Sequence, residues 1–258
     1  MSTARKPLVK PGLNRSFGRV AKRLSPAAQT AVDMAVDAWR VPVDGPVDLQ
    51  KLFPEAAHLV VELGAGTGDQ ILARAAANPA HGHIACEVYR NGLKTMVRGI
   101  EKQSLENLRL CPDDARLLLA ALPDASVDLL LVLYPDPWPK FKHRKRRLIQ
   151  ADTLKDMARV LKPTGTLLVA TDIVDYALWT LHQMYAEGSF FPIATGPAAW
   201  VTPPQGWVPT GYERKAGAEG RTPFYLQFQH KDQVTTQIHN QVRAEKDTRN
   251  RRVSIKRG

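Results

Sequence analysis

The sequence predicts an α/β fold with a doubly wound, mostly parallel sheet and helices on both faces. From residue 58 onward, short apolar segments alternate with segments of helical periodicity, which is typical of right-handed crossovers between parallel strands. The first apolar segment ends in glycines at alternate positions, which allow a sharp backbone turn. The chain has 258 residues, of which 44% are hydrophobic, and this content supports one substantial core.

The elements are expected in the following order. Ser25 and Pro26 are typical of an N-cap and a first helical residue, so a helix begins there and runs to about Trp39. The prolines and glycine of residues 41–46 end that helix. Apolar segments then predict strands near 58–63, 83–87, 107–111, 127–133 and 165–171. Helical patterns between and after them predict helices near 69–78, 92–105, 114–121, 145–161 and 174–187.

The composition changes after Gly188. Residues 192–223 are rich in proline, glycine and tryptophan, and the alternating segment 223–229 predicts a late strand that completes the sheet edge. The last 27 residues are polar and charged and are expected to form a helix or a mobile tail. The predicted organisation is a basic arm and helix over 1–50, a catalytic domain over 51–231 and a basic tail over 232–258.

The charge distribution favours a polyanionic partner. The formal net charge is +11, and the first 23 residues contain seven Lys or Arg and no acid. Basic residues also concentrate in 140–147 and 243–257. Each basic side chain that meets a phosphate releases counterions, so three separated clusters indicate a large ligand such as a nucleic acid. A mitochondrial transit peptide is the alternative interpretation of the first cluster.

Composition also bears on the compartment. Cys86 and Cys111 are expected to be buried free thiols, which fits a reducing cytosol and hence a cytoplasmic protein. The longest purely apolar segment, residues 129–134, is far shorter than the roughly 20 residues of a membrane span. No membrane association is therefore expected.

The turn after the first strand predicts a cofactor site. Gly64, Gly66 and Gly68 have the spacing G-x-G-x-G, whereas a dinucleotide site requires G-x-G-x-x-G. Asp69 places an anion where a pyrophosphate would lie. The preceding carboxylate, Glu62, suits the cationic aminoacyl end of S-adenosylmethionine instead.

Two further acids follow later strands. Glu87 comes 25 residues after Glu62, where an acid can accept both ribose hydroxyls, although a solvated strand-end glutamate is the alternative. Asp113 and Asp114 follow the third strand, where a carboxylate could accept from the adenine amino group. Helix capping by either aspartate is the competing interpretation, and both roles can coexist.

The fourth strand leads directly into Pro135-Asp136-Pro137-Trp138. Prolines on both sides of Asp136 restrict the backbone, which predicts a carboxylate held at the reaction site, with a simple turn as the alternative. The basic segment from Lys140 to Arg147 follows at once and favours contact with nucleic acid over a solvated face. The fifth strand ends in Asp172, which adds an acid to the same rim.

These motifs occur in one order that resembles the bacterial family of tRNA (guanine(46)-N7)-methyltransferases. The resemblance extends from about Arg15 to Gln229. It is carried by Glu-Leu-Gly-x-Gly-x-Gly, Glu-Val-Tyr-x-x-Gly, Asn107-Leu-Arg-Leu, Asp114-Ala, Tyr-Pro-Asp-Pro-Trp-x-Lys, Lys142-His-x-Lys-Arg-Arg, Ala-Thr-Asp172 and Thr210-Gly-Tyr-Glu-Arg. Pro139, Asn91, Ala65 and Thr67 depart from the residues that are frequent in the family.

The resemblance implies a seven-stranded class I methyltransferase fold that uses S-adenosylmethionine to methylate N7 of guanine 46 in the variable loop of tRNA. It implies that Glu62, Gly64, Gly66, Gly68, Glu87, Asp114 and Asp136 bind the cofactor, with Asp136 also at the reaction centre. It implies guanine binding by Lys140, Asp172, Thr210, Gly211, Tyr212 and Glu213. It implies RNA contact by Lys142, His143, Arg144, Lys145, Arg146 and Arg147.

Three alternatives remain open at this point. Enzymes that methylate base amino groups use Asn/Asp-Pro-Pro-aromatic after the fourth strand, and the order Pro-Asp-Pro-Trp disfavours that reaction. A nicotinamide oxidoreductase is disfavoured by the glycine spacing. A non-catalytic RNA-binding subunit would be expected to have lost the four strand-end acids. No metal-ligand spacing is visible, His58 and His182 fit surface or core positions, and the choice between monomer and homodimer stays open.

Overall fold

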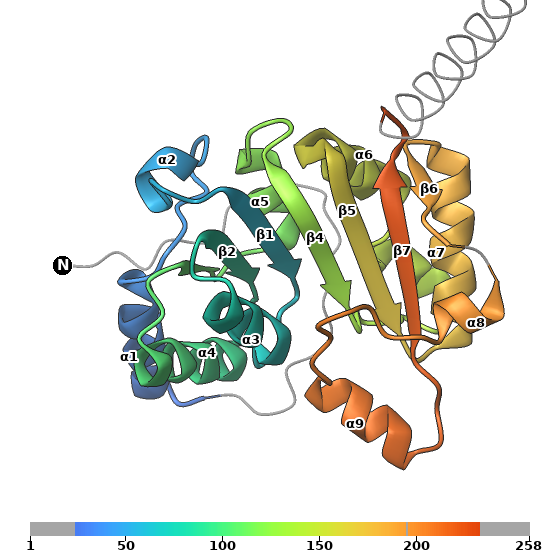
Figure 1. Cartoon of the computed structure of the whole chain (residues 1–258). Coiled ribbons are helices and arrows are strands. Elements are labelled where there is room, and N and C mark those ends of the chain that lie inside the picture. The colour runs from blue at the N-terminus through green and yellow to red at the C-terminus, as the bar shows by residue number, and fades with distance from the viewer. Residues whose placement is uncertain (1–23, 195, 233–258) are drawn as a thin grey trace, which may run out of the picture.

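The computed structural model describes residues 24–194 and 196–232, and seven strands in these residues form one sheet (Figure 1). The strand order is β3-β2-β1-β4-β5-β7-β6. The strands are β1 (His58–Leu63), β2 (His81–Cys86), β3 (Leu108–Cys111), β4 (Val127–Leu133), β5 (Leu161–Thr171), β6 (Phe190–Pro192) and β7 (Phe224–His230). The predicted α/β class and the seven strands implied by the resemblance are confirmed.

Strands β1 to β5 are parallel, and their order reverses at the centre of the sheet. β1 pairs with β2 on one side and with β4 on the other, so the chain winds outward in both directions from this point. In open parallel sheets, ligands bind beyond the carboxyl ends of the strands at such a reversal. The carboxyl ends of β1 and β4 therefore mark the expected position of the functional site, at the lower edge of the sheet in Figure 1.

The late strand was expected at the edge of the sheet, and this expectation is wrong. β7 pairs antiparallel with both β5 and β6, so it is an inner strand and β6 is the edge. β6 has only three residues and ends in Pro192, which an edge strand tolerates because one of its sides needs no hydrogen-bonding partner.

Helices cover both faces of the sheet (Figure 1). One buried cluster includes Val36, Ile71 and Met96 from α1 (Pro26–Asp37), α3 (Asp69–Ala77) and α4 (Arg90–Gln103). The other includes Leu118, Leu154 and Tyr176 from α5 (Ala115–Ala121), α6 (Ala151–Val160) and α7 (Val174–Glu187). The short helix α2 (Leu49–Leu52) packs at the margin of the second cluster.

Local signals account for most helix ends. Ser25 accepts a hydrogen bond from the backbone N–H of Ala28 at 3.3 Å, which confirms the predicted N-cap of α1, although the helix ends at Asp37 rather than near Trp39. The single helix predicted over 145–161 is instead the 3₁₀ helix η1 (Phe141–Arg146) followed by α6. A capping box between Gln150 and Thr153 begins α6 after the basic segment has ended.

Two helices lie in the segment for which the sequence pattern predicted none. These are α8 (Pro197–Trp200) and α9 (Gly211–Ala218). Thr210 caps α9 by accepting from the backbone N–H of Glu213 at 3.1 Å, and T-x-x-E is a sequence signature of such a cap. That signature could have located α9.

The basic segments 1–23 and 233–258 lie outside the described residues, so the predicted arm and tail, and the division at residues 50 and 231, stay predictions. Cys86 and Cys111 are free and buried, as expected. Among the described residues, no helix combines the length and the apolar character needed to cross a bilayer.

Candidate active site

The glycine turn after β1 requires a left-handed backbone at all three of its glycines. The φ angles are 78° at Gly64, 55° at Gly66 and 81° at Gly68, which strain other residues. Helix α4 packs directly against this turn, because a Cβ atom on Gly92 would lie 2.1 Å from the carbonyl oxygen of Gly66. Gly92 belongs to the Glu-Val-Tyr-x-x-Gly motif, and this close approach explains why only glycine fits there.

Glu87 follows β2 and holds the glycine turn from the other side. Its Oε2 accepts from the backbone N–H of Gly66 and its Oε1 from that of Tyr89, both at 2.7 Å. Burial raises the pKa of Glu87, and the neighbouring charge of Asp136 contributes in the same direction. Each carboxylate oxygen has a second lone pair, so both remain able to accept from a ligand hydroxyl.

Glu62 lies inside β1, beneath the same turn, and is 2% exposed. Its Oε2 is buried and has no hydrogen-bonding partner among the described residues. Burial raises the pKa of Glu62, Arg74 opposes the shift, and the charges of Glu87 and Asp69 add to it, which brings the pKa to about 8. A buried carboxylate with an open acceptor beside a bare backbone turn fits a cationic ligand group.

Glu62→Gln should be more stable to heat than the wild type at pH 9, and this advantage should shrink as the pH falls to 5. The reason is that a carboxyl pKa raised to about 8 in the folded protein contributes stability below the unfolded pKa of 4.5, and that contribution is lost as the pH rises through 8. Thermal unfolding at both pH values tests this. A wild type that is equally or more stable than the variant at pH 9 would contradict it.

Asp114, after β3, combines the two roles that the sequence left open. It caps α5 by accepting from the backbone N–H of Arg116 at 3.0 Å, and it also binds the Arg116 guanidinium at 2.8 Å and 2.7 Å. The neighbouring Asp113 is partly exposed and lies 3.8 Å from Arg40. Burial raises the pKa of Asp113. Both aspartates therefore lie at the end of β3, with Asp114 the more firmly oriented.

Asp136 is exposed between two residues with unusual backbone conformations. Tyr134 and Trp138 have φ angles of 50° and 40°, which are rare for bulky residues. Such outliers persist only where surrounding structure enforces them, and they concentrate at functional sites. Burial and the charges of Glu87 and Asp136 raise the pKa of Tyr212, so these carboxylates converge on one region.

The predicted guanine-binding residues lie beside this region. Glu213 accepts from the indole N–H of Trp207 at 2.6 Å and from the hydroxyl of Tyr225 at 2.7 Å. Asp172 binds Arg221 at 2.5 Å. The Tyr212 ring stacks on that of Tyr134, with centroids 6.3 Å apart and an angle of 15° between the planes. The first turn of α9 thus returns to the carboxyl ends of β4 and β5.

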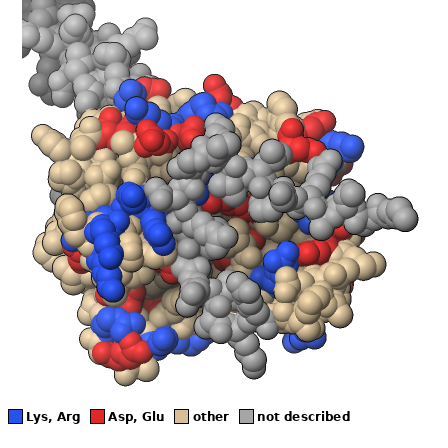
Figure 2. Space-filling view, turned by 180° about the vertical axis from the view of Figure 1, so that it is seen from behind, with Lys and Arg blue, Asp and Glu red and all other residues tan. Residues whose placement is uncertain are grey.

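The basic segment forms η1 next to Asp136. Lys140 precedes it, and both Lys140 and the neighbouring Lys142 are exposed, as is Lys145. Arg144 pairs with Asp175 at 2.7 Å, and the Arg146 guanidinium lies 4.9 Å from the centroid of the Trp138 ring. Figure 2 shows that, on the face opposite to the view of Figure 1, Lys and Arg side chains lie in separate groups with acidic side chains among them.

Arg147 corrects one prediction for the basic segment. Its side chain is fully buried, donates to the carbonyl oxygen of Pro137 at 2.8 Å and pairs with Asp175. The guanidinium lies over the rings of Tyr176 and Trp179. A buried guanidinium cannot meet an RNA phosphate, so Arg147 instead fixes the segment that carries Asp136 to α7.

Arg147→Met should therefore lower the free energy of unfolding by about 2 kcal/mol or more, because it removes a hydrogen bond and cation–π contacts in the interior. Lys145→Met is the matched control on an exposed position of the same segment and should change stability by less than about 0.5 kcal/mol. Urea unfolding measures both. Equal stability of the two variants would show that Arg147 has no structural role.

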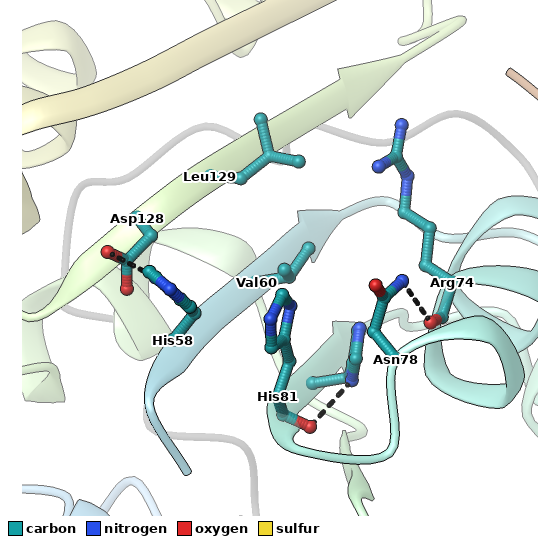
Figure 3. A pocket seen from close by; sticks show the side chains of 8 residues that line it. His58, Val60, Arg74, Asn78, His81, Asp128 and Leu129 are labelled. Carbon is teal, nitrogen blue, oxygen red and sulfur yellow. Dashed lines mark hydrogen bonds and ion pairs between the residues drawn. The ribbon is translucent and has the colours of Figure 1, made fainter. Parts of the chain in front are cut away.

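A pocket of about 240 Å³ lies at the opposite, amino edge of the sheet (Figure 3). Imidazole rings and Asp128 form part of its wall, and His58 binds Asp128 at 3.1 Å. It is lined by His58, Val60, Arg74, Asn78, His81, His83, Asp128 and Leu129. None of the predicted site residues lines it. No cluster of metal-ligating side chains occurs in residues 24–194 and 196–232.

The family model described as "Putative methyltransferase" matches residues 56–226. A tRNA (guanine-N(7)-)-methyltransferase of Hyphomonas neptunium is 42% identical over 203 residues, covering 78% of this chain and 93% of the relative. One from Mesorhizobium japonicum is also 42% identical, over 216 residues, covering 82% of this chain and 93% of the relative. The crystal structure of the 16S rRNA methyltransferase KamB superposes with a TM-score of 0.50 at 16% identity, covering 74% of this chain and 98% of that chain, a likeness of fold.

Proposed function

Because the chain belongs to the family of tRNA (guanine-N(7)-)-methyltransferases, we propose that it methylates N7 of a guanine in tRNA, namely guanine 46 of the variable loop. The observation that carries this proposal is the gathering of Glu62, Glu87 and Asp136 around one glycine turn at the centre of the sheet. The charge of Glu87 raises the pKa of Glu62, and the charge of Asp136 raises that of Glu87, which supports a single site for the three acids.

The residues present fit S-adenosylmethionine as the methyl donor. The open Oε2 of Glu62 suits its ammonium group, the glycine turn gives it a surface without side chains, and Glu87 suits its ribose hydroxyls. Asp113 or Asp114 suits the adenine amino group. When bound, this cofactor supplies an electrophilic methyl group on a sulfonium centre.

The protein then contributes mainly by aligning guanine N7 with the methyl group and by stabilising the positive charge that develops on the purine. Guanine N7 carries a lone pair and no proton, so no general base is required. Transfer of the methyl group to N7 would form one N–C bond as one S–C bond breaks, and it would leave the purine cationic. Carboxylates held in place before the reaction stabilise that charge, and correct alignment supplies the remaining rate enhancement.

In this proposal, Asp172 and Glu213 recognise the target base. A carboxylate can accept from guanine N1–H and N2–H, and these groups become better donors as the ring gains positive charge. In the free protein both acids already accept from protein donors, Arg221 for Asp172 and Trp207 with Tyr225 for Glu213. These bonds hold the acids in place, and Lys140, Thr210, Gly211 and Tyr212 complete the proposed guanine site.

The RNA contact we propose is divided between η1 and the termini. Lys142, His143, Arg144, Lys145 and Arg146 contribute from η1. Residues 1–23 and 233–258 together contain 14 of the 36 Lys and Arg but 2 of the 25 acids, so the remaining residues hold 22 basic and 23 acidic side chains, a net charge of −1. All the excess positive charge thus resides in the termini, and phosphate attraction depends on them. The buried thiols fit action in a reducing cytosol.

Incubating the pure protein with methyl-labelled S-adenosylmethionine and bulk tRNA, then digesting the RNA to nucleosides, tests the function. The proposal expects label in N7-methylguanosine alone. Label in N6-methyladenosine would establish amino-group methylation instead. Binding of tRNA without any label would establish a non-catalytic RNA-binding subunit.

A further inference from the structure

We propose that Asp69 is a positioning residue that clamps residues 208–214 onto the glycine turn and thereby holds the base-recognition residues against the methyl-donor site. This inference rests on the proposed function for its catalytic consequence. The clamp itself consists of contacts between residues 69–70 and residues 208–214, and these contacts do not depend on the proposed function.

Asp69 uses its carboxylate in an unusual way for the first residue of a helix. An acid at this position ordinarily serves the free N–H groups of its own first turn. Here Oδ1 accepts from the hydroxyl of Thr67 at 3.1 Å. Oδ2 accepts from the backbone N–H of Gly211 at 2.7 Å and from the Arg214 guanidinium at 3.1 Å. The carboxylate therefore joins the cofactor turn to a segment more than 140 residues later.

The next residue, Gln70, strengthens the same junction. It is fully buried and its side-chain amide donates to the carbonyl oxygen of Val208. Arg214 completes the clamp from α9, because its second terminal nitrogen donates to the carbonyl oxygen of Pro209 at 2.6 Å. The start of α3 thus holds residues 208 and 211, and the residues between them have little freedom to move.

The clamped segment carries the side chains that face the reaction site. A Cβ atom on Gly66 would lie 3.5 Å from the Tyr212 ring, so this ring covers the glycine turn. Glu213 follows directly, and Thr210 caps the helix that orients both. Asp69 touches neither the proposed base nor the methyl group, so its effect on the reaction passes through these neighbours.

The ion pair between Asp69 and Arg214 is too exposed to serve mainly for stability. The side chains of Asp69 and Arg214 are 26% and 63% exposed, and exposed ion pairs contribute little to the free energy of unfolding. Small displacements of aligned groups, in contrast, reduce reaction rates strongly. The structure therefore assigns the pair a role in placement.

Two variants break the clamp from opposite sides. Asp69→Ala removes the acceptor, and Arg214→Met removes the guanidinium that binds both Asp69 and the carbonyl oxygen of Pro209. Asp69 also raises the pKa of Glu62 by its charge, and Arg214→Met leaves that charge in place. If both variants lower kcat to a similar extent, the loss comes from displaced residues and not from the missing charge of Asp69. Asp33→Ala breaks an exposed carboxylate pair with Arg90, between α1 and α4, and serves as the matched control.

Both clamp variants should reduce kcat for tRNA methylation about tenfold or more while KM for tRNA changes little. Amide hydrogen exchange in residues 208–214 should become faster in both, and Asp33→Ala should change neither quantity. A kcat within twofold of the wild type in both variants, or unchanged exchange, would overturn the inference. Should Asp69→Ala fail to fold, Arg214→Met provides the same measurements.

The exchange measurement also separates this inference from the proposed function. A wild-type protein that leaves tRNA unmethylated would refute the function, whereas the clamp would still be tested by exchange. A wild type that methylates tRNA beside variants of equal kcat would refute the clamp alone.

Discussion

Replacing Asp136 with alanine should lower kcat for tRNA methylation about 10²- to 10³-fold and leave tRNA affinity within about twofold of the wild type. Asp136 follows β4 at the point where the strand order reverses, and its backbone is held by two prolines and two strained neighbours. In the proposed mechanism, a fixed charge there stabilises the purine as it becomes cationic. Single-turnover kinetics and filter binding of tRNA measure the two effects.

Two other variants define what the carboxylate does. Asp136→Asn keeps the shape of the side chain and loses the charge, so it should be nearly as slow as the alanine variant. Asp124→Ala alters an exposed aspartate just before β4, at the far edge of the sheet, and should retain full activity. Wild-type turnover in Asp136→Ala would remove this residue from the mechanism.

Neutralising all 14 Lys and Arg residues in the two terminal segments to Gln should weaken tRNA binding by about 10³-fold or more at physiological salt. The described part of the chain carries almost no net charge, so the long-range attraction for phosphates is lost with these residues. Affinity for S-adenosylhomocysteine should stay unchanged, because the terminal charges are not part of its proposed site. Salt-dependent filter binding and calorimetry test the two statements.

Two triple variants that remove the same charge from different places show whether the location of basic residues matters for tRNA binding, or only their total charge. Arg249, Arg251 and Arg252 changed to Gln should reduce the slope of log affinity against log salt concentration by up to about three. Lys51, Lys94 and Lys102, which are exposed elsewhere, should have little effect when changed in the same way. Equal slopes for the two triple variants would mean that only the total charge matters.

The sequence was sufficient for the parallel part of the fold because each strand from β1 to β5 is followed by a helical pattern or a distinctive turn. The edge of the sheet could not be predicted in the same way. β6 is three residues long, too short for any periodicity, and its partner β7 therefore looked like the edge itself. The strands pair through contacts distant in sequence, and a local pattern carries no information on strand order.

In the candidate site, too, the sequence predicts the features that follow from local patterns and misses those that depend on distant contacts. Glu62, Glu87 and Asp136 follow from their positions near the ends of predicted strands, since the carboxyl ends of parallel strands share one edge. The burial of Arg147 could not be foreseen from a run of basic residues, because it depends on Asp175 and two aromatic rings of α7. The role of Asp69 likewise depends on a loop that returns from residues 208–214.

A crystal structure with S-adenosylhomocysteine bound tests the central claim most directly, namely that acids at the carboxyl ends of β1, β2 and β4 form one methyl-donor site. We expect the nucleoside beside the glycine turn, with its ribose hydroxyls on Glu87 and its ammonium group near Glu62. Binding in the histidine-lined pocket at the amino edge of the sheet, away from all three carboxylates, would contradict the claim.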